Sequence, residues 1–351
     1  MRLDDLRGVI RAAHDSGTAL RLRGAGSKDF YGGMLAGEVF DVAGYSGIVA
    51  YEPSELYITA RCGTPLAEIE AVLAEQGQML AFEPPHFAGA TVGGCVAAGL
   101  AGPRRQQAGA VRDFVLGAKL IDGTGQVLDF GGQVMKNVAG YDVSRLLAGS
   151  LGTLGLLAQV TLKVLPRPVA EATLCFALDE AEAYARLNVW GGQPLPISAT
   201  FWAAGQLFLR LSGARAAVEA AAERLQGDAL EAAGAFWQAV REQTHPAFAG
   251  ERLWRLALPT TAPPLDSAGL RACEWGGGLR WYAGDLSPAV LRELAQRAGG
   301  HAVLYRAPES QRCLEGAFAP LSPALLALHR RLKKAFDPQG VLNPGRLYAE
   351  L

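Results

Sequence analysis

The sequence predicts an α+β protein made of two domains, with a C-terminal segment that returns to the first of them. Its 351 residues suffice for about two domains of roughly 150 residues each. Segments with helical spacing and segments with strand alternation interleave along the chain, which favours helices packed on antiparallel sheets. Glycine-rich loops are dense before Pro168 and sparse after it. We therefore expect domains at residues 1–168 and 169–315, and a returning segment at 316–351.

The first domain is expected to begin with a helix. Apolar residues at helical spacing run from Leu3 to Ala13, and Gly17 provides a left-handed end. A strand at 19–23 follows and leads directly into a glycine loop. The remaining predicted elements are strand 56–62, a helix over 66–73 with Thr64 and Pro65 as its cap and first turn, hairpin 115–121/126–130 and strand 160–164.

In the second domain, predicted strands and helices alternate more regularly along the sequence. This order is typical of an α+β layer of ferredoxin-like type, with helices on one face of an antiparallel sheet. Its predicted strands are 173–177, 197–202, 207–211, 253–258, 278–282 and 302–305, and its predicted helices are 180–189, 215–225, 231–243 and 288–298. In the last segment, Ser322 and Pro323 cap a helix with Leu325, Leu328, Leu332 and Phe336 on one face. An Asn343-Pro344-Gly345 turn follows, and we expect this segment to pack on the first domain.

Composition excludes several classes of protein. The chain has 33 Lys and Arg against 34 Asp and Glu, a net charge of −1, so nucleic acid is not its main partner. With 50% apolar and 19% charged residues it is not disordered, and it is expected to bury surface against another chain. Stretches 87–103 and 146–162 lack charges, but glycines in the first exclude a membrane helix, and we expect loops and strands in both. No secretory signal pattern follows Met1, so the cytoplasm is the expected location.

Cysteine and histidine spacing matches neither a disulfide framework nor a metal site. The odd number of widely spaced cysteines indicates reduced, mostly buried thiols. The histidines form no HxH or HExxH pair, so no metal is expected. The sequence also lacks a GxSxG elbow and a GxxxxGK[ST] loop, which removes the usual support for serine hydrolases and P-loop NTPases.

Three loops of small residues are the chemically informative feature. Gly24-Ala25-Gly26 follows a strand and is either a tight turn or a cradle for an anion, because glycine lets backbone N–H groups approach a phosphate. It is not a Rossmann fingerprint, since Asp29 occupies the third glycine position. Small residues gather again at 91–102 and at 152–155. Three such loops on one α+β unit favour a bulky ligand lying against backbone.

The order of these loops resembles the flavoproteins of the vanillyl-alcohol oxidase, or PCMH, type. The matching segments are Arg23-Gly24-Ala25-Gly26-Ser27, Thr91-Val92-Gly93-Gly94, Val111-Arg112-Asp113, Gly149-Ser150-Leu151-Gly152-Thr153-Leu154-Gly155 and Asn343-Pro344-Gly345. Three further segments, 83–86, 102–105 and 136–142, are similar to the FAD-binding E subunits of bacterial glycolate oxidase (glycolate dehydrogenase), and this similarity extends along the whole chain. The resemblance implies a PCMH-type FAD-binding domain of two subdomains with a smaller cap domain.

The resemblance also implies the residues around the cofactor. Residues facing the pyrophosphate would be Gly24, Ala25, Gly26, Ser27 and Lys28, those on the flavin side Thr91, Gly93, Gly94 and Gly102, and those beside the adenosine Gly155 and Val160. Arg23 is either a phosphate contact or a solvated charge at a strand end. Some relatives attach the flavin to a histidine just after the pyrophosphate loop, whereas Ser27-Lys28-Asp29-Phe30 stands here. The FAD is therefore expected to be non-covalent.

Catalytic residues are not assigned. Catalytic D subunits and other 2-hydroxy-acid members carry a late H-x-G-D-G-N-x-H segment, and this sequence lacks one. His301 is a lone imidazole or a substrate base, and Arg280 or Arg306 could provide only the cation for a carboxylate.

The resemblance implies a subunit of a complex that oxidises glycolate, with D-lactate as a second option, to the 2-oxo acid. Its implied partners are the FAD-containing catalytic D subunit and an iron–sulfur subunit, with peripheral association at the inner face of the plasma membrane through the complex. A structural or electron-relay role is preferred. The alternatives are a self-sufficient FAD-dependent 2-hydroxy-acid oxidoreductase and a scaffold that has lost FAD.

Overall fold

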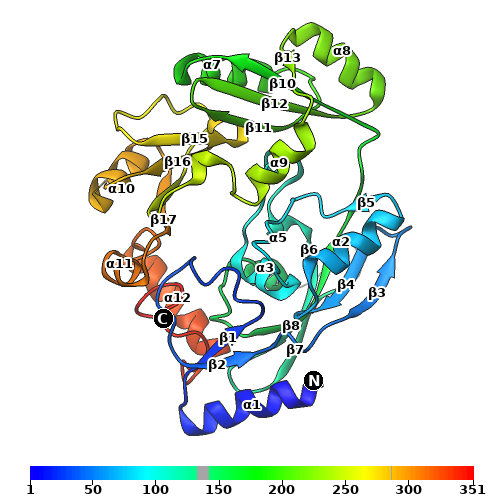
Figure 1. Cartoon of the computed structure of the whole chain (residues 1–351). Helices are drawn as coiled ribbons and strands as arrows, with labels where there is room; N and C mark the ends of the chain where they lie inside the picture. Colours follow the sequence, from blue (N-terminus) through cyan, green and yellow to red (C-terminus); the bar gives the residue numbers. More distant parts are fainter. Residues whose placement is uncertain (133–141, 286) are drawn as a thin grey trace.

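The computed structural model describes residues 1–132, 142–285 and 287–351 of the chain (Figure 1). Most of segment 136–142, used above for the resemblance, lies outside these residues. The chain forms a five-stranded antiparallel sheet near the N-terminus and an eight-stranded antiparallel sheet from the middle of the sequence. The five-stranded sheet with its helices is called the first half here, and the eight-stranded sheet with its helices is called the cap.

The sheet of the first half has the order β3-β4-β8-β6-β7. Its strands are β3 (Ile48–Glu52), β4 (Tyr57–Arg61), β8 (Leu156–Lys163), β6 (Val115–Ile121) and β7 (Val127–Gly131). Central β8 pairs with β4 and β6, and hairpin β6–β7 places Lys119 opposite Asp129. The predicted hairpin and the predicted strands in this region are confirmed.

A smaller unit precedes this sheet. Helix α1 (Leu3–Ser16) buries Leu6 and Ile10 and ends at Gly17, whose φ of 71° is the predicted left-handed end. Strand β1 (Leu20–Arg23) pairs in parallel with β2 (Glu38–Asp41), which the sequence analysis did not predict. The remaining elements of the first half are α2 (Leu66–Glu75), β5 (Gln78–Met79), α3 (Val92–Ala98), α4 (Arg105–Ala108), α5 (Val111–Phe114), α6 (Val143–Leu146) and β9 (Leu165–Pro166).

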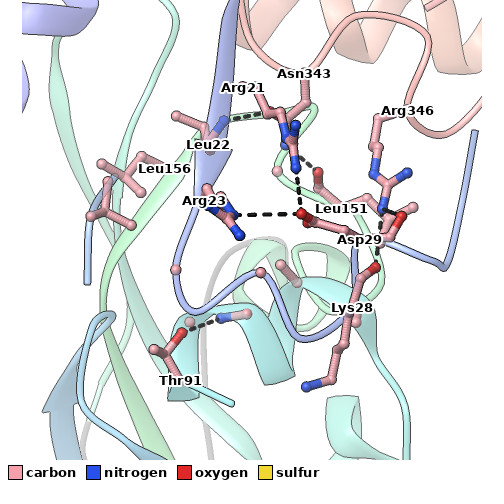
Figure 2. A pocket seen from close by; sticks show the side chains of 18 of the residues that line it. Arg21, Leu22, Arg23, Lys28, Asp29, Thr91, Leu151, Leu156, Asn343 and Arg346 are labelled. Atoms are coloured by element: carbon pink, nitrogen blue, oxygen red, sulfur yellow. Dashed lines mark hydrogen bonds and ion pairs between the residues drawn. The ribbon is translucent and has the colours of Figure 1, made fainter. Parts of the chain in front are cut away.

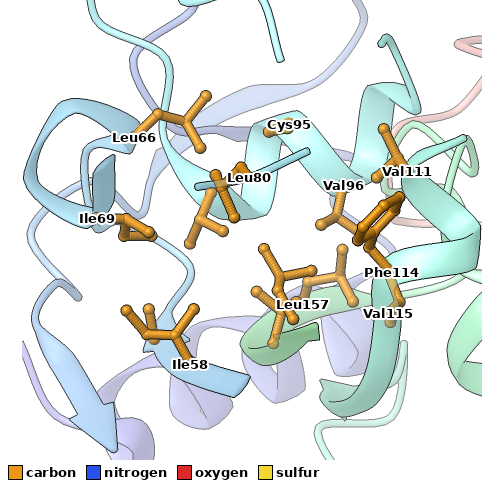
Figure 3. Packing of buried hydrophobic residues seen from close by; sticks show 14 of the residues in the cluster. Ile58, Leu66, Ile69, Leu80, Cys95, Val96, Val111, Phe114, Val115 and Leu157 are labelled. Carbon is orange, nitrogen blue, oxygen red and sulfur yellow. The ribbon is translucent and has the colours of Figure 1, made fainter. Parts of the chain in front are cut away.

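Apolar side chains from α2, α3 and α5 meet those of β4 and β8 in the largest buried cluster of the first half (Figure 3). Ile58, Ile69, Val96 and Leu157 contribute to it, and each is at most 4% exposed. Burial of this cluster fixes α3 against the sheet, so the backbone around the start of α3 is held in place from one side.

The cap sheet has the order β13-β10-β12-β11-β15-β16-β14-β17, and every pair in it is antiparallel. Its strands are β10 (Ala170–Ala177), β11 (Ile197–Ala203), β12 (Gln206–Gly213), β13 (Asp228–Ala229), β14 (Leu253–Ala257), β15 (Leu270–Glu274), β16 (Leu279–Ala283) and β17 (His301–Arg306). Its helices are α7 (Glu180–Gly191), α8 (Arg215–Leu225), α9 (Ala233–Arg241), α10 (Pro288–Arg297) and α11 (Glu309–Glu315), with short 3-10 turns at Pro246–Phe248 and Trp275–Gly277. Clusters around α7, α8 and α10 cover one face of the sheet, while α9 lies with the opposite face.

Two sequence expectations were wrong. Residues 92–98, expected as loop or strand, form helix α3, and Thr91 Oγ1 accepts a hydrogen bond from the Gly94 N–H over 3.3 Å as its N-cap. Tertiary burial overrides the low helix propensity of paired glycines there. Thr64 does not cap α2, because its hydroxyl donates to the Arg61 carbonyl over 2.7 Å and helix α2 begins after Pro65 without a side-chain cap.

The C-terminal helix α12 (Pro323–Phe336) is capped by Ser322 as predicted, and the segment after it returns to the first half. A β-bridge joins Leu20 to Leu342. Lys333 Nζ donates to the carbonyl of Thr153 and to Asp337 Oδ2 at 2.8 and 2.7 Å. Only part of the expected apolar face of α12 packs against the protein: Leu332 and Phe336 contact the core, whereas Leu325 and Leu328 are exposed. None of the helices in the described ranges is long and apolar enough to cross a membrane.

Candidate cofactor site

The three predicted loops of small residues meet around one pocket, called the glycine-loop pocket here (Figure 2). Its cavity volume is about 120 Å³, far more than the space that a single water molecule needs. Residues 21–29 line one side, the start of α3 another, and residues 151–157 a third. Of the predicted cofactor residues, the pocket brings together Gly24, Ala25, Gly26, Ser27, Lys28, Thr91, Gly93, Gly94 and Gly155.

The loop after β1 presents its backbone to this pocket. Gly26 has a φ of 72°, and no described residue accepts a hydrogen bond from the backbone N–H groups of 25–28. A run of N–H groups around a left-handed glycine forms a concave donor surface that suits a phosphate. A Cβ on Gly26 would lie 2.5 Å from the Arg23 guanidinium, so this loop also packs closely on its own strand.

Three arginines lie near the loop, and each has hydrogen-bond or ion-pair partners within the protein. Arg21 forms an ion pair with Asp29, and Arg23 Nε lies 3.5 Å from the same carboxylate. Arg346 donates to the carbonyls of Gly33, Lys28 and Asp29 at 2.7 to 3.2 Å, and burial lowers its pKa to about 10. Asp29 also lines the pocket, but its carboxylate is already engaged by Arg21 and Arg23.

Lys28 differs from these arginines. Its ammonium donates to Ser27 Oγ over 3.5 Å and lies 5.4 Å from the ring centroid of Phe87, and no carboxylate of the described residues is within ion-pair distance. The side chain is partly buried, and this burial lowers its pKa. Figure 2 shows the side chain directed away from Asp29. A negatively charged ligand in the pocket would supply the missing counter-charge.

The C-terminal segment completes the pocket. Asn343 Oδ1 accepts from the Leu22 N–H at 2.7 Å, and its Nδ2 donates to the Leu151 carbonyl at 2.6 Å, so one side chain ties β1 to the third loop. Sequence reasoning found the Asn-Pro-Gly turn but did not assign Asn343 or Arg346 to the site. Both residues lie more than 300 positions away from the first loop in the sequence, so no local sequence pattern indicates the contact.

Two predicted cofactor residues lie elsewhere. Val160 is 1% exposed in β8, and its side chain belongs to the apolar core of the first half. Gly102 lines a separate, smaller cavity, where a Cβ would lie 2.2 Å from the Glu83 carbonyl oxygen. Close packing against that carbonyl accounts for glycine at this position. The predicted cofactor contacts of these two residues stay predictions.

The three catalytic candidates do not meet. Arg280 is fully buried in the cap and donates to the carbonyls of Gly277, Pro263 and Ala262. Arg306 donates to the Phe248 carbonyl and to Gln243 Oε1. His301 begins β17, where burial and then Arg255 lower its pKa. None of these side chains lines either described cavity, and the described residues contain no group of three or more potential metal ligands.

The residues present fit a cofactor that combines a pyrophosphate with a large planar group. The loop offers free backbone donors for two phosphate charges, together with the ammonium of Lys28, which has no carboxylate partner among the described residues. Other parts of the lining, including Ala97, Ala98 and Leu156, are small or apolar, which suits a ring system. The chemistry of the lining therefore agrees with FAD.

Comparison with known proteins gives the same result. Residues 2–131 match the family of FAD binding domains, and residues 319–347 match the C-terminal domain of FAD linked oxidases. Alkyldihydroxyacetonephosphate synthase has a similar structure, with a TM-score of 0.67 and 14% identity over 97% of this chain and 74% of that one, which shows the shared fold.

Two curated relatives refine the assignment. Glycolate oxidase subunit GlcD of Bacillus subtilis is 29% identical over 139 residues, 40% of this chain and 30% of that protein. Glycolate oxidase subunit GlcE of Escherichia coli K12 is 49% identical over 348 residues, which is 99% of this chain and 97% of that protein. The expected resemblance is confirmed: the chain belongs to the glycolate oxidase subunit GlcE family of FAD-binding oxidoreductase subunits.

Proposed function

We propose that this chain is the FAD-carrying E subunit of a complex that oxidises glycolate to the 2-oxo acid, and that it has a structural or electron-relay role in that complex. The observation that carries the proposal is the glycine-loop pocket, in which free backbone donors and the unneutralised Lys28 face one cavity. FAD, when bound, supplies two-electron chemistry with a choice of one-electron steps. D-lactate is a second substrate option for the complex.

In this proposal the pyrophosphate is held by Gly24, Ala25, Gly26, Ser27 and Lys28, the flavin side of the cofactor by Thr91, Gly93 and Gly94, and the adenosine side by Gly155. The attachment is non-covalent. In support, no histidine of the described residues lines the pocket, and Cys62 is buried with a pKa raised to about 12, so it is a poor nucleophile.

The proposed partners are the catalytic, FAD-containing D subunit and an iron–sulfur subunit. The chain offers no convergent set of catalytic side chains among its predicted candidates, so substrate oxidation is assigned to the D subunit. We further propose a cytoplasmic location, with attachment to the inner face of the plasma membrane through the complex. The domain division 1–168, 169–315 and 316–351 is also a proposal, supported by the confinement of the cap strands to residues 170–306.

A test of this role uses rapid mixing. The isolated FAD-loaded chain is mixed anaerobically with glycolate, and the flavin absorbance is followed. A site without a positioned base loses about 10²- to 10⁴-fold in rate, so the oxidised spectrum should persist for many seconds. Complexes reconstituted with and without this chain should differ in turnover. Bleaching of the isolated chain at the turnover rate of the complex would show instead that it oxidises glycolate itself.

A self-sufficient 2-hydroxy-acid oxidoreductase remains the second candidate, because one observation favours it. The smaller cavity beside Gly102 contains Arg255 and Glu274, a cation and a carboxyl group that the sequence analysis did not consider. The same rapid-mixing experiment separates the two candidates.

A further inference from the structure

The apolar side of helix α12 is only partly covered by the rest of the chain. Leu325, Leu328 and Leu332 recur at intervals of three and four residues, so they lie on one side of the helix. Leu332 and Phe336 pack on the core of the first half. Leu325 and Leu328, about two turns and one turn before Leu332, are 49% and 43% exposed. The N-terminal half of α12 therefore presents leucines that the chain itself leaves uncovered.

Positive charge accompanies these leucines. Residues 316–336 contain four Lys and Arg and no Asp or Glu. Lys333 is buried and forms an ion pair with Asp337 at 2.7 Å. The other three cations are exposed, and no carboxylate of the described residues lies within ion-pair distance of them: Arg330, Arg331 and Lys334. The exposed part of α12 therefore combines uncovered leucines with unpaired cations.

The opposite side of α12 holds the helix in place. Lys333 Nζ donates a hydrogen bond to the Thr153 carbonyl at 2.8 Å, and the His329 ring lies 5.8 Å from the Tyr348 ring, measured between centroids. Thr153 belongs to the third glycine loop, so α12 also supports one wall of the glycine-loop pocket. A surface on a helix fixed in this way binds a partner without the entropic cost of ordering a mobile segment.

The width of the exposed leucine stripe favours contact with another helix over contact with a lipid bilayer. A helix that lies in a membrane surface buries a wide apolar face that includes Trp or Phe. The aromatic rings of this segment are engaged within the chain instead. Phe318 contacts Tyr31 at 5.5 Å between ring centroids, and Phe336 contacts Phe130 at 6.2 Å. Leucines at intervals of three and four form the narrow seam along which two helices pack.

We propose that Leu325, Leu328 and Arg331, called the α12 surface here, dock against a helix of a partner subunit that presents apolar side chains flanked by Asp or Glu. Arg331 follows Leu328 by three residues and so lies beside it, where it can pair with a carboxylate at the rim of the contact. The chemistry of the partner follows from the α12 surface itself. Its identity as the catalytic D subunit rests on the proposed function.

Binding of the purified D subunit to the full FAD-loaded chain tests the proposal, and biolayer interferometry measures its affinity. Leu328→Glu places a charge in the apolar seam and should weaken binding at least about 100-fold. Leu325→Ala removes only apolar contact and should weaken it about 10-fold. Arg331→Glu should weaken it about 10-fold at low salt and less at high salt, because salt screens exposed charges.

Two matched controls should bind the D subunit like wild type. Val290→Glu places the same charge on α10 at a side chain that is also 49% exposed, and Arg224→Glu reverses an exposed charge in the last turn of α8. Equal binding by wild type and the three α12 variants would overturn the α12 surface and leave the proposed function intact. A wild-type chain that does not bind the D subunit would overturn the proposed partnership itself, and this assignment with it.

Other occupants of the α12 surface are separated by two measurements on the isolated chain. We expect the wild-type chain to sediment as a monomer in the analytical ultracentrifuge and to remain in solution when phosphatidylglycerol vesicles are pelleted. Self-association that Leu328→Glu abolishes would assign the α12 surface to a second copy of the chain and overturn the proposal. Binding to the vesicles that Leu328→Glu abolishes would assign it to a membrane, which also contradicts the proposal. All variants should keep their flavin, since none of the substituted residues lines the glycine-loop pocket.

Discussion

The glycine-loop pocket and the smaller cavity beside Gly102 are both lined by polar groups, but these groups come from different parts of the chain. In the first half, the donors are consecutive backbone N–H groups of residues 25–28, supported by a single lysine. In the cap, Arg255, Glu274 and Tyr305 line the smaller cavity with side chains that come from three strands. A substitution weakens binding at a backbone site only if it changes the path of the chain. At a side-chain site, each contacting group can be removed by a single substitution while the fold is kept.

Gly26→Val is expected to have the largest effect, because it changes the path of the backbone in the first half. The left-handed φ of 72° is strained by about 1–2 kcal/mol for an L side chain, and the new Cβ would displace the Arg23 guanidinium. Flavin content, measured as the 450/280 nm absorbance ratio, should fall below about a tenth of wild type, with far-UV circular dichroism retained.

The matched control is Gly205→Val, at a left-handed glycine with open space in the turn between β11 and β12. It introduces similar strain far from the pocket and should retain its flavin. Full flavin content in Gly26→Val would show that this glycine only forms a turn.

Glu274→Gln tests the cap in a different way, through the pH dependence of stability. The folded carboxyl has a pKa of about 7 and the unfolded one about 4.5. Between these values the unfolded chain releases its proton first, so wild-type stability falls as pH rises and levels off above pH 7. Gln has no such dependence, so the variant should gain up to about 3 kcal/mol relative to wild type between pH 4.5 and 8.

Urea unfolding followed by tryptophan fluorescence measures this effect in the cap, because all six tryptophans lie between residues 190 and 281. Glu219→Gln, an exposed change on α8, is the control. If the stability difference between wild type and Glu274→Gln does not change with pH, the carboxyl is not held neutral.

Lys28→Met tests how much of the FAD affinity of the glycine-loop pocket depends on a side chain. Loss of one charge-assisted contact should weaken FAD binding about 10- to 100-fold. The cofactor-free protein should be no less stable than wild type, since the buried ammonium has no carboxylate partner among the described residues. Flavin titration and thermal unfolding give both quantities, and the exposed Lys334→Met is the control. Unchanged FAD affinity would mean that backbone groups alone bind the phosphates.

Thr91→Ala is expected to have the smallest effect. The substitution removes the N-cap of α3 and should destabilise the first half by about 1 kcal/mol, while Thr91→Ser should restore it. Thermal unfolding of the cofactor-free protein measures the loss. If stability is unchanged and flavin content falls, Thr91 acts on the cofactor and not on the helix.

The same difference between the two regions explains what the sequence could reveal. A backbone site leaves a local pattern, so the loops at 24–28, 91–94 and 152–155 could be identified before their meeting in one pocket was known. A side-chain site on a sheet leaves no such pattern. Arg255, Glu274 and Tyr305 become neighbours only through the pairing of β14, β15, β16 and β17, and β15 itself was not predicted because it is short and lacks clear alternation.

Most long elements could be predicted, because periodicity and end signals agree there, as in α1 with Gly17 and α12 with Ser322. Helix α3 could not, since its formation depends on burial against the rest of the first half rather than on propensity. Asn343 and Arg346 were missed for a similar reason: their contacts with the first loop arise only when the C-terminal segment returns.

The central claim is that the glycine-loop pocket holds FAD through non-covalent contacts. It is tested most directly by recording the visible spectrum of the purified full chain, precipitating the protein with acid, and measuring FAD in the supernatant and the pellet. The account predicts a flavin spectrum, an equimolar amount of FAD in the supernatant and a colourless pellet. A yellow pellet would contradict non-covalent attachment, and a colourless native protein that takes up no added FAD would contradict binding itself.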